Sequence, residues 1–188
     1  MSFRSTWILF ITICLFAACG PKGNVYIDNG GEDVLTVVVD QTRHDLQPGQ
    51  RTLVELVPGQ HQISVAGPDG KVRRDTSVQI VDGGLINAAG AEFLVWKEVF
   101  APQSSLELRK ALLKPDKLSI NNFVYEIEHM FLPNDQLYVE QFWDLGLMED
   151  FPKKVRGWDL EADKQYMFKT KLVRKSDFAE VYMKASKP

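Results

Sequence analysis

The sequence predicts a mainly β fold: an antiparallel β-sandwich over residues 24–100, followed by a smaller α+β module over residues 101–188. In the first part, short alternating or β-branched runs recur roughly every ten residues between Gly- and Pro-containing turns, which is typical of a sandwich or small barrel. Composition then changes near residue 98. Eleven glycines and three aromatic residues lie between Gly20 and Lys97, whereas two glycines and thirteen aromatic residues follow. The change favours two modules, and a single continuous core is the alternative.

The strands of the first module are predicted from alternation and from the turns that bound them. Residues 34–40 are nearly all β-branched, which suits a buried strand. Within residues 61–66, His61, Ile63 and Val65 share one face. Gly-containing turns separate the runs because Gly accepts positive φ. The predicted strands are Val25–Asp28, Val34–Asp40, Arg51–Val57, His61–Ala66, Val72–Ile80 and Phe93–Phe100.

The second module mixes helix and strand signals. Ser104 and Glu107 match a capping box that opens a helix, which Pro115 ends. Residues 122–132 alternate along their whole length and predict a strand, and residues 138–142 and 166–173 are further strand candidates. A short last helix is predicted with Ser176 as its cap and with one face formed by Phe178, Val181 and Tyr182.

The first module also resembles a known type of domain. Leu46-Gln47-Pro48-Gly49 and the run from Leu56 through Pro58-Gly59-Gln60-His61 to Val65 look like PEGA-type and carboxypeptidase-regulatory-like β-sandwich modules. The resemblance covers about forty residues of a pattern that recurs wherever a hairpin turns before a strand. It implies a non-catalytic accessory or adhesion role on an exported protein, and it carries over no binding residue.

The first nineteen residues have the order of a secretory signal. Arg4 precedes an apolar run over residues 7–16, and small residues lead to Cys19. The run is about ten residues long, and a helix needs about twenty to cross a bilayer. The segment is therefore predicted to be a signal peptide rather than a membrane span.

Phe16-Ala17-Ala18-Cys19 resembles the lipobox of bacterial lipoproteins, with Phe16 where Leu is usual. The resemblance implies cleavage after residue 18, a diacylglyceryl thioether on Cys19 and acylation of the new N-terminus, for example with palmitate. Gly20 follows where an Asp would favour retention in the inner membrane, so the outer membrane is favoured. Residues 19–23 then form a lipidated tether. The alternative is a conventional cleavage site near an ordinary Cys19, and Cys14 is a poorer lipidation candidate.

Charge and cysteine content exclude several classes of function. The net charge of −3 argues against a nucleic-acid groove. Cys14 and Cys19 are the only cysteines, so the body after residue 19 has no disulfide, no thiolate nucleophile and no Cys-ligated metal.

No residue pattern predicts catalysis, a cofactor or a metal. His129 is predicted to pack between its strand neighbours, His61 to open a strand, and His44 to lie in a solvated turn. No serine has the Gly-x-Ser-x-Gly setting of a nucleophile. Neither acidic set, Asp28 to Asp40 or Asp144 to Asp150, has the periodicity of a calcium loop.

The best candidate for binding is the segment from residue 138 to residue 158, where aromatic residues alternate with charges. Tyr138, Phe142, Trp143 and Trp158 are the candidate binding residues, because aromatic faces beside charges recognise sugars and peptides. The alternative is that these rings fill the core of the second module.

Together these features predict a non-enzymatic, lipid-anchored protein of the bacterial cell envelope that acts as a binding or structural accessory module. Its expected partners are the membrane, through the anchor, and another envelope protein or glycan, with no nucleic acid. The alternative is a hydrolase of envelope glycans or peptides with paired carboxylates in the second module.

Overall fold

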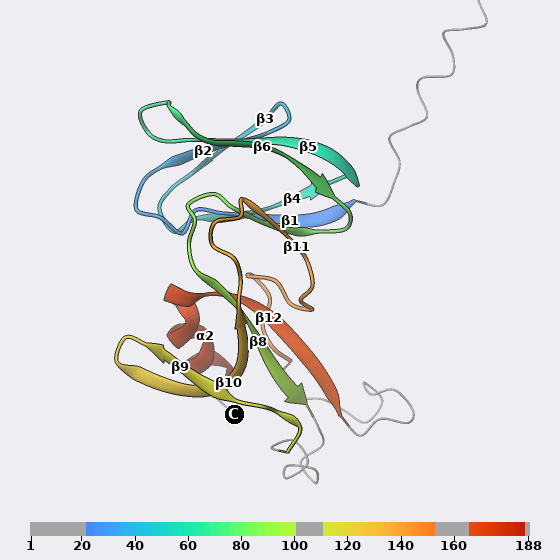
Figure 1. The fold of residues 1–188 in the computed structure, drawn as a ribbon, viewed down its shortest axis with the longest axis vertical. Helices are drawn as coiled ribbons and strands as arrows, with labels where there is room; N and C mark the ends of the chain where they lie inside the picture. The colour runs from blue at the N-terminus through green and yellow to red at the C-terminus, as the bar shows by residue number, and fades with distance from the viewer. Residues whose placement is uncertain (1–21, 101–110, 153–165, 187–188) are drawn as a thin grey trace, which may run out of the picture.

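The computed structural model describes residues 22–100, 111–152 and 166–186. The predicted mainly β fold is confirmed (Figure 1). The strands are β1 (Gly23–Asp28), β2 (Leu35–Val39), β3 (Thr42–Leu46), β4 (Arg51–Leu56), β5 (Gly59–Ala66), β6 (Val72–Ile80), β7 (Gly84–Asn87), β8 (Phe93–Phe100), β9 (Asp116–Ile120), β10 (Phe123–Phe131), β11 (Tyr138–Glu140) and β12 (Met167–Arg174). They are followed by a 3-10 turn, η3 (Lys175–Asp177), and a helix, α2 (Phe178–Ala185).

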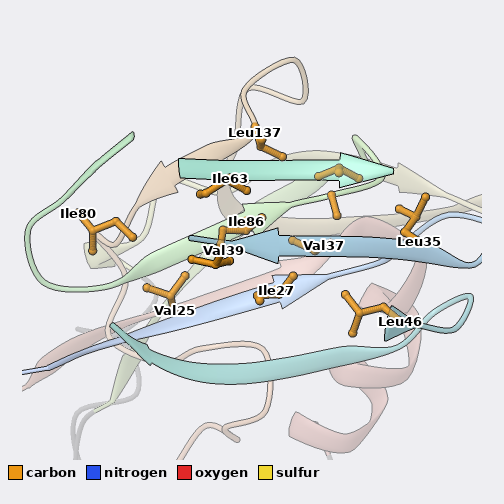
Figure 2. Close-up of a cluster of buried hydrophobic side chains, with 12 residues drawn as sticks. Val25, Ile27, Leu35, Val37, Val39, Leu46, Ile63, Ile80, Ile86 and Leu137 are labelled. Atoms are coloured by element: carbon orange, nitrogen blue, oxygen red, sulfur yellow. The ribbon is translucent and has the colours of Figure 1, made fainter. Parts of the chain in front are cut away.

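Two four-stranded sheets face one another and form a sandwich. One has the order β3-β2-β5-β6 and the other β11-β7-β1-β4. Side chains at alternate positions point from each sheet into the space between them (Figure 2). Each fully buried Val, Leu or Ile contributes roughly 1.5–3 kcal/mol, so this core accounts for much of the stability of the sandwich. Its members are Val25, Ile27, Leu35, Val37, Val39, Leu46, Ile63, Val65, Ile80, Ile86, Ala88 and Leu137.

The two central strands of the sheet β11-β7-β1-β4, β7 and β1, are largely buried and are covered on both faces. β1 and β7 pair in parallel, and all four residues of β7 are buried. Ile27 and Ile86 point into the sandwich, whereas Tyr26 and Leu85 point to the opposite face. Parallel strands that are covered on both faces carry consecutive apolar residues. Leu85 and Ile86, at the centre of β7, are such residues.

The third sheet, β12-β8-β10-β9, packs on that opposite face. Strand β8 serves two cores, since Phe93 and Val95 contact the middle sheet while Leu94 and Trp96 face α2. Phe178 of α2 is fully buried, and its ring centroid lies 5.5 Å from that of Trp96. The layers are therefore sheet, sheet, sheet and helix.

The strands near the predicted boundary pair across it. β8 was expected in the sandwich, but it pairs with β10 and β12 in the third sheet. β11 comes from the later part of the chain, yet it pairs with β7 and completes the middle sheet. The domain limits of 24–100 and 101–188 stay a prediction, and the core that joins the two parts matches the alternative of a continuous interior.

Three local predictions need correction or lie outside the description. Residues 42–46, expected to include a turn at His44, form β3. Ser176 does not cap α2: its hydroxyl donates to Asp177, and Asp177 makes no side-chain cap. The capping box at Ser104 and Glu107 lies outside the described residues, although residues 111 and 112 are helical.

Candidate functional site

A pocket of about 450 Å³ opens where the third sheet meets the end of β1. Its wall includes the β9–β10 turn, the β7–β8 connection and the residues after β12. The side chains that give it polarity are those of Glu92, Ser119, Asn121, Lys175 and Ser176, together with that of Arg174.

The β9–β10 turn places one side of the pocket. Asn121 and Asn122 have φ values of 49° and 67°, and Ile120 pairs directly with Phe123. Two successive residues at positive φ make a tight hairpin, and Asn tolerates this conformation better than most residues. The turn therefore holds Ser119 and Asn121 beside the end of β12.

Arg174 forms the base of the pocket and is 6% exposed. Its guanidinium donates to Asp28 and, over 3.2 Å, to the Gly49 carbonyl oxygen. Its Nε has no acceptor among the described residues. A Cβ on Gly30, which also lines the pocket, would lie 3.0 Å from Nε and 2.6 Å from the Cβ of Ala91, so only glycine fits there. The base therefore carries a buried N–H donor without a partner.

Four charged residues under the pocket form what we call the Asp28 cluster: Asp28, Arg51, Arg174 and Asp177. Asp28 is fully buried, and Arg51 Nε lies 3.9 Å from its Oδ1. Burial raises the pKa of Asp28, and the bond and charge of Arg174 only partly offset that rise. With two cations and two anions the cluster is formally neutral, and it joins β1, β4, β12 and η3.

The rim of the pocket carries further charge. Lys175 Nζ lies 2.9 Å from a carboxylate oxygen of Glu92 and 5.5 Å from the centre of the Phe131 ring. Burial acts to raise the pKa of Asp177, but bonds from Arg51 and Ser176 and the nearby cations outweigh it and lower that pKa. Asp177 is thus ionised and neutralises Arg51. Arg174 and Lys175 are the cations that line the pocket, and each has a carboxylate partner, Asp28 for Arg174 and Glu92 for Lys175.

The four predicted binding residues are placed very differently. The Tyr138 hydroxyl donates to the Gly83 carbonyl oxygen over 2.8 Å, and its partly buried side chain packs against the sandwich core. Trp143 is 3% exposed and fills the core between the middle and third sheets, as the alternative expected. Phe142 is 51% exposed. Trp158, like Cys19, lies outside the described residues. A binding role for these rings stays a prediction.

The histidines make structural contacts. The ring centroid of His129 lies 5.4 Å from that of Phe131, and its Nδ1 lies 3.2 Å from the Ile127 carbonyl oxygen. His129 therefore packs beside its strand neighbours, as its position in the sequence predicted. His61 is 6% exposed and lies with one ring nitrogen 2.8 Å from Asp40 and the other 2.8 Å from the Val57 carbonyl oxygen.

The carboxylates of the later segment have partners that favour ionisation. Burial acts to raise the pKa of Glu128, but bonds from the Lys114 backbone and from Lys97 lower it overall. The same balance, with Thr170 as the main donor, lowers the pKa of Asp144. A general acid needs the opposite shift. Among the described residues, no three His, Cys, Asp or Glu side chains gather as metal ligands do.

Sequence reasoning missed the pocket because its walls are far apart in the chain. Ser119 and Arg174 come from separate strands, and Gly30 comes from the opposite half. The Asn121-Asn122 pair was a readable hairpin signal, but nothing in the sequence indicated what the turn would face.

No protein-family model, curated protein or solved structure matches this chain. Within the described ranges, none of the helices has the length and apolar character needed to span a bilayer.

Proposed function

We propose that this chain is a non-enzymatic, lipid-anchored binding module of the bacterial cell envelope, held in the outer membrane through Cys19. The observation that carries the proposal is Phe16-Ala17-Ala18-Cys19 at the end of a short apolar run, four residues before β1. Gly20 after the cysteine supports the outer membrane. The accessory-module pattern of residues 46–65 supports a binding rather than a catalytic role.

The pocket above the Asp28 cluster is where this module would hold its partner. Arg174 and Lys175 offer positive charge, and Ser119 and Asn121 offer polar groups around one cavity. Donors of this kind suit an acidic group such as a carboxylate or phosphate, because charge-assisted hydrogen bonds are the stronger ones. Envelope glycans and proteins both carry such groups.

The anchor is tested by cell fractionation and mass spectrometry. A Cys19→Ser chain is expected to leave the membrane fraction and to lack the mass of the diacylglyceryl group. Cys14→Ser is the matched control, since residue 14 belongs to the segment expected to be removed. A chain that retains Met1, or a Cys19→Ser chain that stays membrane-bound, contradicts the proposal.

The binding role is tested by crosslinking the tagged, lipidated protein in intact envelopes. Lys175→Gln is expected to reduce recovery of a stoichiometric partner. Lys117→Gln, on β9 but outside the pocket lining, is expected to leave it unchanged. Equal recovery from both variants removes the pocket from the proposal. Specific turnover of a glycan or peptide by the purified protein overturns the non-enzymatic role.

A further inference from the structure

The covalent anchor leaves little distance between the bilayer and β1. Cys19 and Gly23 are four residues apart, and an extended chain spans at most about 3.6 Å per residue, or roughly 14 Å in all. The end of the sandwich where β1 begins must therefore lie close to the surface that holds Cys19. Figure 1 shows this end of β1 at the right-hand edge of the sandwich.

Strand register identifies which turns share that end. Gly23 pairs with Leu56, so the β4–β5 turn is there. Gly84 lies beside Val25 and Glu140, which brings the β6–β7 turn and the residues after β11 to the same end. The Gln141 backbone N–H donates to the Gly83 carbonyl oxygen over 2.9 Å, which fixes the chain just before Phe142.

Each of these three segments exposes a large apolar side chain. Val57 is 39% exposed, Val81 is 55% exposed and Phe142 is 51% exposed. Phe142 also rests edge-on against Trp143, with ring centroids 5.4 Å apart, and Trp143 is itself buried. A firmly held aromatic ring and two aliphatic side chains thus surround the point where the tether leaves β1. We call them the anchor-side patch.

We propose that the anchor-side patch contacts the bilayer, with Val57, Val81 and Phe142 lying at the boundary between headgroups and acyl chains. The inference rests on the proposed anchor at Cys19, because only that anchor places a bilayer within reach of these side chains. Aromatic and aliphatic groups at that depth add to the hold of the lipid chains.

Charges around the patch specify the kind of lipid surface. Glu55, Asp82 and Glu140 are exposed there. Among the described residues around the patch, the opposing cation is Lys22, whose Nζ is 3.6 Å from Glu55. Burial, with the charges of Glu140 and Asp82, raises the pKa of nearby Tyr138 to about 12. An acidic rim repels anionic lipid. The patch therefore fits a zwitterionic surface, and contact weakens as anionic lipid is added.

This contact also orients the candidate site. The pocket includes Gly30, just past the far end of β1, whereas the patch surrounds the near end of the same strand. Six residues of strand span roughly 20 Å. With the patch on the bilayer, the pocket opens away from the lipid towards a partner in the aqueous space.

Single-cysteine labelling tests the patch cleanly, because the lipidated chain has no other free thiol if Cys19 carries the thioether. Val81→Cys and Phe142→Cys receive an environment-sensitive fluorophore. The matched controls are Val72→Cys, at the other end of β6, and Phe123→Cys, at the β9–β10 turn, which are 60% and 66% exposed in the native protein. The lipidated proteins are reconstituted into phosphatidylcholine vesicles that contain brominated lipid.

The expected result is a shift to shorter wavelength and quenching by bromine at positions 81 and 142, with neither change at positions 72 and 123. Phosphatidylglycerol in the vesicles should reduce both changes. Vesicle flotation and the mass of the lipidated N-terminus are measured on the same samples. Anchored protein with equal signals at both ends overturns the patch and leaves the proposed function standing. Protein that neither floats nor carries lipid overturns the anchor and the patch together.

Discussion

Removing one charge from the Asp28 cluster should destabilise the fold far more than removing a matched pair. Asp28→Asn preserves shape but leaves two arginines against Asp177, a buried net charge of +1. Arg174→Met leaves one arginine against two carboxylates, a net charge of −1. In the double variant the cluster is neutral again, and the Arg51–Asp177 pair remains.

The size of the effect follows from burial. Asp28 is fully buried and the Arg174 side chain is 7% exposed, and removing one partner of such a pair costs about 3–5 kcal/mol. Arg51, 3.9 Å from Asp28, and Asp177, 3.8 Å from Arg174, partly compensate, so each single variant should lose about 3 kcal/mol of unfolding free energy. The double variant should lose at least about 2 kcal/mol less than the sum.

Urea unfolding of the purified protein, followed by circular dichroism, measures all four free energies. Arg43 and Asp45, an exposed pair at 2.9 Å on β3, supply the control cycle, and their removal should change stability little because solvent screens them. If the losses of Asp28→Asn and Arg174→Met simply add in the double variant, the two groups are not coupled and the account of the cluster is wrong.

Two further predictions concern a histidine and a glycine. Burial acts to lower the pKa of His61, but its bonds to the Val57 carbonyl and to Asp40 outweigh burial and raise that pKa overall. The imidazolium should therefore stabilise the fold fully below pH ~6.5. This stabilisation should disappear as pH rises through the higher folded-state pKa. The melting temperatures of wild type and His61→Gln should therefore converge between pH 6 and pH 9 or so, and a constant gap contradicts this. Gly146→Ala places a Cβ against the Tyr26 ring and hydroxyl and should cost about 1–3 kcal/mol, and an unchanged urea midpoint would show that this contact is looser.

Local pattern predicted most strands because alternation records which side of a sheet each residue faces. The run 34–40 became β2 and the run 122–132 became β10, within one or two residues. β3 was missed because its residues are mostly polar and exposed, so nothing in them signals burial. β7 was missed because it is only four residues long and begins at Gly84, in a Gly-Gly pair that is typical of a turn.

Pairing between distant strands could not be predicted. Composition does change near residue 98, but the sheets do not follow it. β8, which precedes the change, pairs with β12 in the third sheet, and β11, which follows it, pairs with β7 in the middle sheet. The pocket depends on the same long-range pairing, because β12 brings Arg174 to Asp28 and β9 brings Ser119 into the pocket wall with Arg174. The burial of Trp143 could not be predicted for the same reason. Its neighbours in sequence are charged or exposed, and only the stacking of two sheets buries it.

The parallel pairing of β1 with β7, and the antiparallel pairing of β7 with β11, set an order of events for a chain made from its N-terminus. Until Tyr138–Glu140 has been made, β7 keeps a bare edge, and Tyr26 and Leu85 lack the cover that Val139 and Trp143 give them. A chain that stops at residue 100 therefore exposes an unpaired strand edge and is prone to associate with other copies of itself. Such a chain gains from chaperone protection until nearly three quarters of its length has been made.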